Sequence, residues 1–199
     1  MTRQRCPTPA HGAIVLAAGA STRLGRPKQL IDIDGEPLLR RVTRCALATR
    51  PCDAVVVLGH DAELIGTALD GIDVRTLRIA DAAATGMAAS LRAGIEALDA
   101  RCGGALIVLT DQPALSGTHL DALCATWRGD PTRAVASAYA GVVGVPAVLP
   151  RAWFADIVAL RGDVGARALL RTRRSEVIGV SAPELAWDVD AAEDLPSSY

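Results

Sequence analysis

The sequence predicts an α/β fold: a Rossmann-like three-layer α/β/α arrangement with a largely parallel mixed sheet, in a single domain spanning residues 1–199. Short apolar runs, such as AIVLAA at 13–18, alternate with segments whose apolar residues recur at helical spacing. Strands that are apolar on both faces are typical of parallel sheets, because helices cover both sides of such a sheet. No repeat, low-complexity tract or convincing linker divides the chain, which is long enough for one sizeable core.

The first two thirds of the chain repeat a strand followed by a helix. Apolar runs predict strands at 13–18, 54–58, 74–79 and 105–109. Amphipathic segments predict helices at 37–49, 61–69 and 86–100, and a fourth helix that contains Leu120, Leu123, Cys124 and Trp127. Pro37 suits the first turn of its helix, because an N–H there has no partner within the helix, and Asp61 can cap the next helix. Asp34-Gly35 predicts a tight turn.

The chain after Ala134 is less regular, and we expect it to add antiparallel strands. Its apolar runs predict strands at 135–140, 143–149 and 176–180. Helices are predicted at 166–171 and in the segment that contains Trp153, Phe154, Ile157 and Val158.

Composition narrows the range of functions. The net charge is −1, so the chain lacks the basic field that drives sequence-independent nucleic-acid binding. No segment approaches the apolar length of a membrane span. Five scattered cysteines without a Cys-x-x-Cys pair indicate neither a disulfide framework nor a zinc site, and they fit a reducing compartment. We therefore expect a cytoplasmic protein with no nucleic-acid or membrane partner.

The three histidines lack metal-ligand spacing. We expect ordinary core or surface roles for His11 and His119. His60 follows the second predicted strand and could reach a ligand.

The segment VLAAGASTRLGRPKQL at 15–30 joins the end of the first predicted strand to a loop of small residues. Ligands of open α/β sheets bind at the carboxyl ends of strands, where small residues let backbone N–H groups approach a phosphate. The spacing of Gly19 and Gly25 differs from that of a Walker A loop, and Ser21 stands where the Rossmann fingerprint requires glycine. We expect the loop to bind phosphates in another way.

Two cations accompany this loop. Arg23 lies within it and can clamp phosphate oxygens with two hydrogen bonds. Lys28 is the only lysine among the 21 basic residues, and its ammonium is a compact point charge suited to a phosphate. The alternative is a surface lysine placed by chance, but the neighbouring glycine loop favours a functional role.

Blocks of sequence along nearly the whole chain resemble the nucleotidyltransferases related to molybdenum cofactor cytidylyltransferase and guanylyltransferase. The blocks are LAAGASTRLGRPKQL at 16–30, GEPLL at 35–39, GMAASL at 86–91, TDQP at 110–113, GVPAVLP at 144–150, GDVGARALL at 162–170 and DVDAAEDL at 188–195. A single block would be weak support for the resemblance, but several blocks in the same order as in the family strengthen it.

The resemblance implies a nucleotide site around the first block. The residues implied to hold the nucleotide are Leu16, Ala17, Ala18 and Gly19, with Gly86 and Ser90 near the base and ribose. Arg23 and Lys28 would contact the phosphates as catalytic residues.

The resemblance also implies a Mg²⁺ site, since Mg²⁺ prefers one or two carboxylates with substrate phosphates and water. Asp111 matches the metal-binding aspartate and would be the third catalytic residue, and Asp190 matches a second metal aspartate. Taken alone, Asp111 before Gln-Pro is more often only a turn residue, and it is the neighbouring family blocks that favour metal binding. For Asp163 and Arg167 we favour contacts on the acceptor side. The alternative is that Asp163 caps a helix on which Arg167 is solvated.

The blocks also bear on the substrates. Members of the family that use CTP tend to read Leu-Ala-Ala-Gly where GTP users read Leu-Ala-Gly-Gly, and this chain has the CTP form. The methyl of Ala18 would narrow the space beside the base. Transferases acting on molybdopterin often carry His or Asn before the proline of the GVPAVLP block, where Val145 stands here.

These observations predict a Mg²⁺-dependent nucleotidyltransferase that transfers CMP from CTP, or a nucleotide from another NTP, to the phosphate of a molybdopterin-type cofactor and releases pyrophosphate. A molybdenum hydroxylase is a candidate partner. Two alternatives stay open: a non-catalytic cofactor-binding accessory protein for such a hydroxylase, and an NAD(P)H-dependent oxidoreductase of the same family. The missing Rossmann glycine argues against the oxidoreductase, and Lys28, Asp111 and Asp190 favour an enzyme over a carrier.

Overall fold

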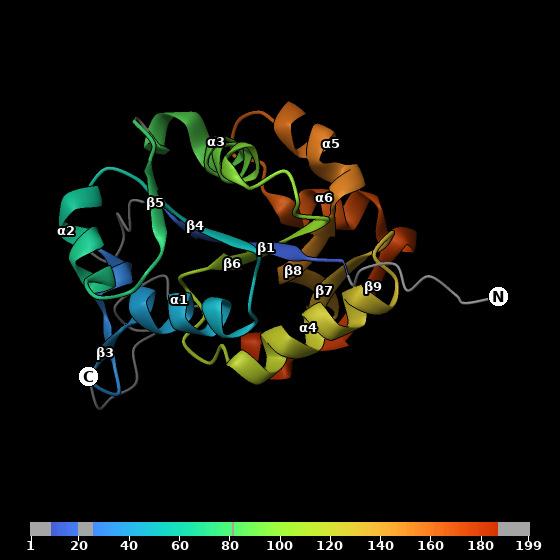
Figure 1. The fold of residues 1–199 in the computed structure, drawn as a ribbon, viewed down its shortest axis with the longest axis horizontal. Helices are drawn as coiled ribbons and strands as arrows, with labels where there is room; N and C mark the ends of the chain where they lie inside the picture. The colour runs from blue at the N-terminus through green and yellow to red at the C-terminus, as the bar shows by residue number, and fades with distance from the viewer. Residues whose placement is uncertain (1–8, 20–25, 81, 187–199) are drawn as a thin grey trace.

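A computed structural model describes residues 9–19, 26–80 and 82–186, and it confirms the predicted three-layer α/β fold (Figure 1). A mixed sheet of seven strands forms the middle layer, in the order β5, β4, β1, β6, β8, β7, β9. The strands are β1 (His11–Ala17), β4 (Asp53–Leu58), β5 (Arg75–Arg78), β6 (Gly104–Leu109), β7 (Ala134–Tyr139), β8 (Val142–Pro150) and β9 (Val177–Ser181).

Parallel and antiparallel pairing divide the sheet as the sequence predicts. β1 is parallel to β4 and β6, and β4 is parallel to β5. β8 is antiparallel to both of its neighbours, β6 and β7, while β9 is parallel to β7. Within the described part of this seven-stranded sheet, the antiparallel pairs thus form only through the chain after Ala134.

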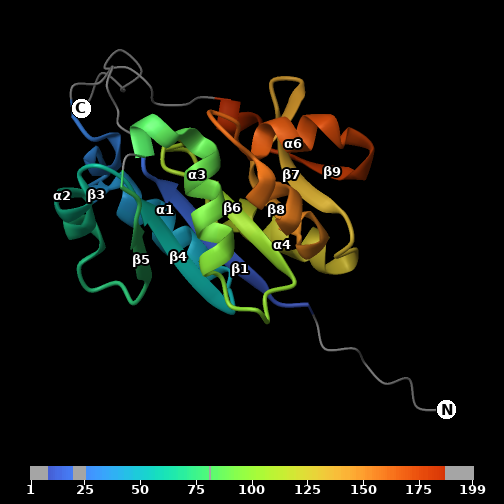
Figure 2. The same ribbon diagram turned by 90° about the horizontal axis from the view of Figure 1, so that it is seen from above.

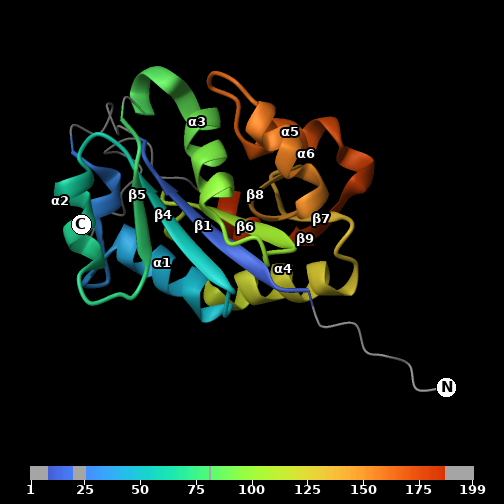
Figure 3. The same ribbon diagram turned by 45° about the horizontal axis from the view of Figure 1, so that its top comes forward.

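Helices cover both faces of the sheet (Figures 1 and 3). One face carries α1 (Leu38–Ala48), α2 (Ala62–Gly66) and α4 (Gly117–Gly129), and the other carries α3 (Ala82–Ala97), α5 (Phe154–Ala159) and α6 (Ala166–Thr172). Short 3₁₀ segments are η1 (Lys28–Leu30), η2 (Thr67–Leu69), η3 (Arg151–Trp153), η4 (Arg174–Glu176) and η5 (Pro183–Ala186). Among the helices of the described ranges, none has the length and apolar character needed to cross a bilayer.

The central strand β1 contributes to two cores. Every residue of β1 is buried. Because side chains alternate along a strand, Ala13, Val15 and Ala17 join the core beneath α1 and α4, and Ile14 and Leu16 join the core beneath α3. This two-sided burial explains the unbroken apolar run in the sequence.

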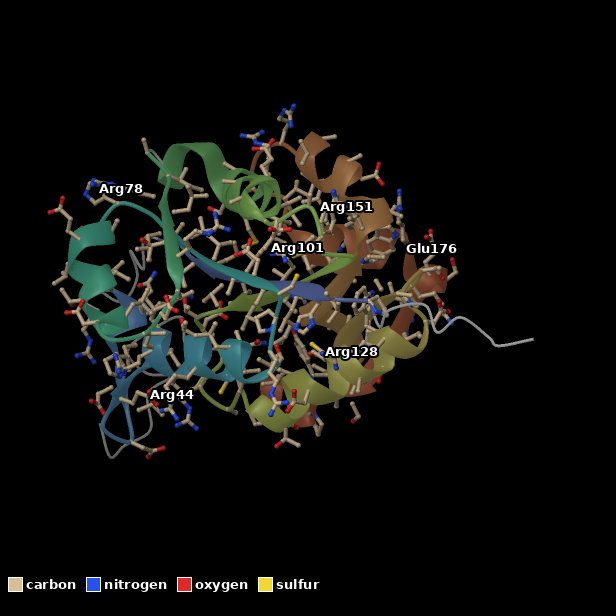
Figure 4. All side chains as sticks on the ribbon, viewed as in Figure 1. Arg44, Arg78, Arg101, Arg128, Arg151 and Glu176 are labelled. Atoms are coloured by element: carbon tan, nitrogen blue, oxygen red, sulfur yellow. The ribbon has the colours of Figure 1, made fainter. Side chains whose placement is uncertain are left out.

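The predicted tight turn at Asp34-Gly35 is confirmed. It joins β2 (Asp32–Ile33) to β3 (Glu36–Pro37) in a small separate hairpin. Both turn residues have positive φ, 57° and 85°, as a type I′ turn requires. Glu36 accepts hydrogen bonds from Arg44 of α1, labelled in Figure 4, and this contact ties the hairpin to the helix.

Two helices differ from their predicted form. The segment predicted as one helix at 61–69 consists of α2 followed by η2. The helix predicted from Gly86 begins earlier, at Ala82, and is interrupted at Gly86, where φ is 72°. That left-handed conformation favours glycine and cannot continue a right-handed helix.

The close packing of α3 on β1 (Figure 2) predicts that Gly94→Ala destabilises the protein. A Cβ at position 94 would lie 2.6 Å from Cγ2 of Ile14, which is fully buried. Overpacking typically costs about 1–3 kcal/mol, whereas alanine gains roughly 1 kcal/mol over glycine in a helix. We expect the free energy of unfolding in urea to fall by about 1 kcal/mol.

Gly66→Ala is the matched control. Gly66 is also helical, but a Cβ there would meet only Leu58 Cδ1, at 3.9 Å. Its free energy of unfolding should stay level or rise. Equal losses in the two variants would contradict a specific contact at Gly94.

Candidate active site

The carboxyl ends of β1, β4 and β6 meet at one edge of the sheet. Leu16 of β1 is paired with Leu109 of β6, so Ala18 and Asp111 leave the sheet side by side. After β4, Gly59 lies so close to this point that a Cβ on it would come 2.5 Å from Ala18 O. This is the edge at which open α/β sheets bind ligands.

Lys28 and Asp111 meet at this edge although 83 residues separate them in the chain. Lys28 Nζ donates a hydrogen bond to Asp111 Oδ2 over 3.3 Å. The two side chains are only 16% and 19% exposed, so solvent screens this pair of charges less than it would an exposed pair. The structure thus brings together two of the three predicted catalytic residues.

The other carboxylate oxygen of Asp111 is suited to a cation. Oδ1 is buried and has no hydrogen-bond partner among the residues that the structure describes, although buried polar atoms normally have one. A carboxylate oxygen is the kind of ligand that Mg²⁺ prefers, so this atom fits the predicted metal. Within the described ranges no group of three or more His, Cys, Asp or Glu residues could by itself hold a metal ion.

Gln29 belongs to the site, although the sequence predicts no role for it. Its side chain is fully buried, and Nε2 donates hydrogen bonds to Ala17 O (2.8 Å) and Gly19 O (2.9 Å). Gln29 therefore fastens the segment that carries Lys28 to the end of β1, on both sides of Ala18. A polar residue in an expected loop gives no sign of such burial, so the sequence offered no signal beyond its place after Lys28.

α3 directs Ser90 toward the same edge. Leu98 lies against Gly12 at the start of β1, and Gly94 lies against Ile14, so the helix runs antiparallel to the strand. Ser90, about one turn before Gly94, is therefore closer to the carboxyl end of β1. Its side chain is largely buried.

Gly86 joins α3 to the sequence block at 162–170. A Cβ on Gly86 would lie 2.6 Å from Gly162 O and 2.9 Å from Asp163 N, and Ala88 N donates a hydrogen bond to Gly162 O. Together with the positive φ, this approach requires glycine. The structure thus places Asp163 beside the kink in α3.

Asp163 and Arg167 are both exposed. α6 begins at Ala166, and its N-cap residue, Gly165, has no side chain to form a cap. Asp163 therefore does not cap this helix, whereas Arg167 is solvated on it, as that alternative expected. Both side chains are open to a ligand from solvent.

Val145 turns its side chain into the core beneath α3 and is 8% exposed. Its carbonyl accepts hydrogen bonds from Gln112 Nε2 (3.2 Å) and Tyr139 OH (3.1 Å). The position thus presents no polar side chain to a ligand, and its backbone is tied to the residue after Asp111.

The remaining candidate residues are Arg23, Asp190 and the three histidines. Arg23 and Asp190 lie outside the described residues, and their roles stay predictions. His11 and His119 are buried core residues, as expected; burial lowers the pKa of His11 to about 4 and also lowers the pKa of His119. His60 is exposed, with Nε2 4.0 Å from a carboxylate oxygen of Asp61.

Residues 13–177 match the family described as the MobA-like NTP transferase domain. The chain belongs to this family. A MobA-like NTP transferase acts on a nucleoside triphosphate, which fits a cation and a carboxylate held together at the carboxyl edge of β1 and β6.

Two relatives by sequence differ in how much of their length the chain covers. The purine catabolism protein PucB of Bacillus subtilis (strain 168) is 29% identical over an aligned length of 196, and the match covers 94% of this chain and 92% of PucB. The bifunctional protein GlmU of Streptomyces griseus subsp. griseus is 42% identical over an aligned length of 122, and the match covers 59% of this chain but 25% of GlmU. The chain therefore spans about a quarter of the length of the GlmU proteins that it matches.

The fold has close counterparts among solved structures. Rv0371c from Mycobacterium tuberculosis H37Rv superposes with a TM-score of 0.81 and 28% identity, covering 93% of this chain and 95% of Rv0371c. A further Rv0371c structure, a complex with manganese, superposes with a TM-score of 0.78 and 25% identity, covering 93% of this chain and 95% of that one. A divalent cation thus accompanies a relative of the MobA-like transferase described here.

The contacts of Gln29 predict a pH-dependent defect in Gln29→Glu. A carboxylate would face the carbonyl oxygens of Ala17 and Gly19, so its pKa would rise above the ordinary value of about 4.3 in the folded protein. Stability is then retained below about pH 4.3, where the acid is neutral in both states, and is lost as the pH rises through the folded pKa. We expect a loss of about 1–3 kcal/mol at pH 7 in urea unfolding.

Gln29→Met is the control, because it removes both hydrogen bonds without adding a charge. Its loss of stability should not vary with pH beyond the variation of the wild type. The same pH profile in both variants would contradict contact of Gln29 with the two carbonyls.

Proposed function

We propose that this MobA-like transferase moves CMP from CTP to the phosphate of a molybdopterin-type cofactor, with Mg²⁺ as its metal and pyrophosphate as the second product. The observation that carries the proposal is the 3.3 Å contact of Lys28 with Asp111 at the carboxyl edge of β1 and β6. A fixed cation beside a carboxylate with a free oxygen matches what a nucleoside triphosphate and its metal require. A molybdenum hydroxylase is the partner proposed to receive the product.

The reaction needs positioned charge rather than a nucleophilic side chain. The second pKa of a phosphate monoester is about 6, so its oxygen is already anionic at neutral pH. This oxygen attacks the α-phosphorus in line with the leaving group: the new P–O bond forms as the bond to the bridging oxygen breaks, and pyrophosphate leaves with that electron pair. Positive charge held in place before the reaction stabilises the transition state.

Lys28 is proposed to supply that charge. Gln29 anchors the backbone beside it to Ala17 and Gly19, so the ammonium is positioned in advance. Mg²⁺ bound at Asp111 Oδ1 would neutralise negative charge on the triphosphate. We further propose Arg23 as a second phosphate contact and Asp190 as a second metal ligand.

The nucleotide is proposed to lie along Leu16–Gly19. Among the described residues, a Cβ on Gly19 would meet no atom within 4 Å, which supports space for a ligand at this point. Ala18 is packed against the core on the α3 side, the face on which Ser90 lies. Its methyl would narrow the space beside the base and favour cytosine over guanine, with Gly86 and Ser90 near the base and ribose.

The acceptor is proposed to bind beside the kink of α3. Asp163 and Arg167 are exposed there, and the guanidinium of Arg167 is suited to a phosphate. Val145 contributes through its fixed backbone rather than through a polar side chain.

Lys28→Arg should lower the catalytic constant on the order of 10²-fold, the usual cost of losing one preorganised contact. The variant keeps the formal charge, but the wider guanidinium cannot occupy the position of the ammonium. Nucleotide affinity should fall much less, because the loop amides still bind the triphosphate. Steady-state kinetics and calorimetric titration separate the two effects, with Arg101→Lys at the opposite end of the sheet as control. A near-normal catalytic constant in Lys28→Arg would show that any cation serves.

Pyrophosphate release tests the function as a whole. CTP and GTP are compared with Mg²⁺ and a molybdopterin-type acceptor, and we expect faster release from CTP. Ala18→Gly should narrow the difference because it removes the methyl beside the base, whereas Ala17→Gly, on the opposite face of β1, should not. Cofactor binding without pyrophosphate from any nucleotide would instead indicate a carrier, and NAD(P)H oxidation would indicate an oxidoreductase.

A further inference from the structure

A pair of cysteines lies at the amino-terminal edge of the sheet, opposite the Lys28–Asp111 edge. Cys52 directly precedes β4, and Cys102 precedes β6 by two residues. Their Sγ atoms are 2.7 Å apart, and both thiols are free. Because β1 lies between β4 and β6, the two thiols meet across the central strand.

Gly12 of β1 makes this meeting possible. It is paired with Asp53 of β4 and with Ala105 of β6, so it lies level with the segments that carry the cysteines. A Cβ on Gly12 would lie 2.7 Å from Leu98 Cδ2 and 3.0 Å from Cys102 Sγ, so a larger residue at this point would crowd the thiol as well as Leu98.

Hydrogen bonds hold the two cysteine segments together. Asp53, next to Cys52, accepts a hydrogen bond from Asp99 N over 2.8 Å, and Asp99 O accepts one from Cys102 N over 3.0 Å. Cys52 N donates to His11 O of β1 over 2.9 Å. The backbones are thus fixed where the sulfurs already touch, so bridging them needs little movement.

The two sulfurs differ in their access to solvent. Cys52 is half-buried and borders two hollows, of about 440 and 340 Å³; Arg101, labelled in Figure 4, lines the smaller one. Cys102 is fully buried. Burial, together with its contact to Cys52, raises the pKa of the Cys102 thiol to about 12, so this thiol keeps its proton at neutral pH. An oxidant from solvent therefore reaches Cys52 first.

We propose that Cys52 and Cys102 are a reversible oxidation site, at which a hydroperoxide converts the two thiols into an intramolecular disulfide. With hydrogen peroxide, the Cys52 sulfur attacks one oxygen, the O–O bond breaks, and a sulfenic acid and water form. The Cys102 sulfur then attacks the Cys52 sulfur; the S–S bond forms, the S–O bond breaks, and the hydroxyl leaves as water with the Cys102 proton. Two thiols are oxidised by two electrons in total, and the peroxide is reduced to two waters.

Peptide mapping tests this site in the full chain. The protein is reduced with dithiothreitol, freed of it, exposed to hydrogen peroxide, digested without reductant and analysed by mass spectrometry. We expect a peptide in which Cys52 is joined to Cys102 with the loss of both thiol hydrogens, and dithiothreitol should restore both thiols. Linkage of either cysteine to a different one, or failure to link, would overturn the proposal.

Thermal unfolding gives a second readout, independent of nucleotidyl transfer. The link spans 50 residues of chain, and closing a loop of that length should raise the Tm of the oxidised protein by about 10 °C. Cys52→Ser should lose both the link and the shift, whereas Cys45→Ser, a half-buried cysteine of α1, should keep both. An equal shift in Cys52→Ser, or no shift in the wild type, would contradict the proposal.

Discussion

β1 is hydrogen-bonded to β4 along one edge and to β6 along the other, and helices cover both of its faces. A buried strand must have its backbone groups paired, so its register with both neighbours is tightly constrained. That register sets what lies at each end of the strand. At the carboxyl end Ala18 emerges beside Asp111, and at the amino end Gly12 lies level with the segments that carry Cys52 and Cys102. The candidate active site and the proposed oxidation site are thus two consequences of one strand pairing.

Glycines, which have no side chain, are as important to the packing of this fold as the side chains of its core. Gly94 lets α3 settle on Ile14, Gly59 lets the end of β4 approach Ala18, and Gly86 lets α3 contact the loop at 162–163. In each case a Cβ would meet an atom at less than 3.0 Å. The close approach of helix, strand and loop around the carboxyl edge therefore depends on glycine at these points.

Two side-chain amides donate hydrogen bonds to backbone carbonyls at the end of β1 and at the irregular part of β8. Gln29 caps the carbonyls at the end of β1, and Gln112 caps the carbonyl of Val145. Leaving a buried carbonyl without a donor would be costly. The residues that follow β1 and β6 are thereby fixed in position, which is what a charge such as that of Lys28 requires to act on a phosphate.

The sequence by itself determined the succession of strands and helices along the chain. Strands buried on both faces have unbroken apolar runs, and helices buried on one face have apolar residues at helical spacing. It also determined the turn at Asp34-Gly35, since positive φ restricts the residues that fit, and it marked Lys28 and Asp111 through the blocks around them. Only the tertiary structure decided that Lys28 touches Asp111, that Gln29 is buried, and that Cys52 meets Cys102. The local sequence around these residues does not predict the contacts. Strand register and close packing bring the residues together, and both depend on segments far apart in the chain.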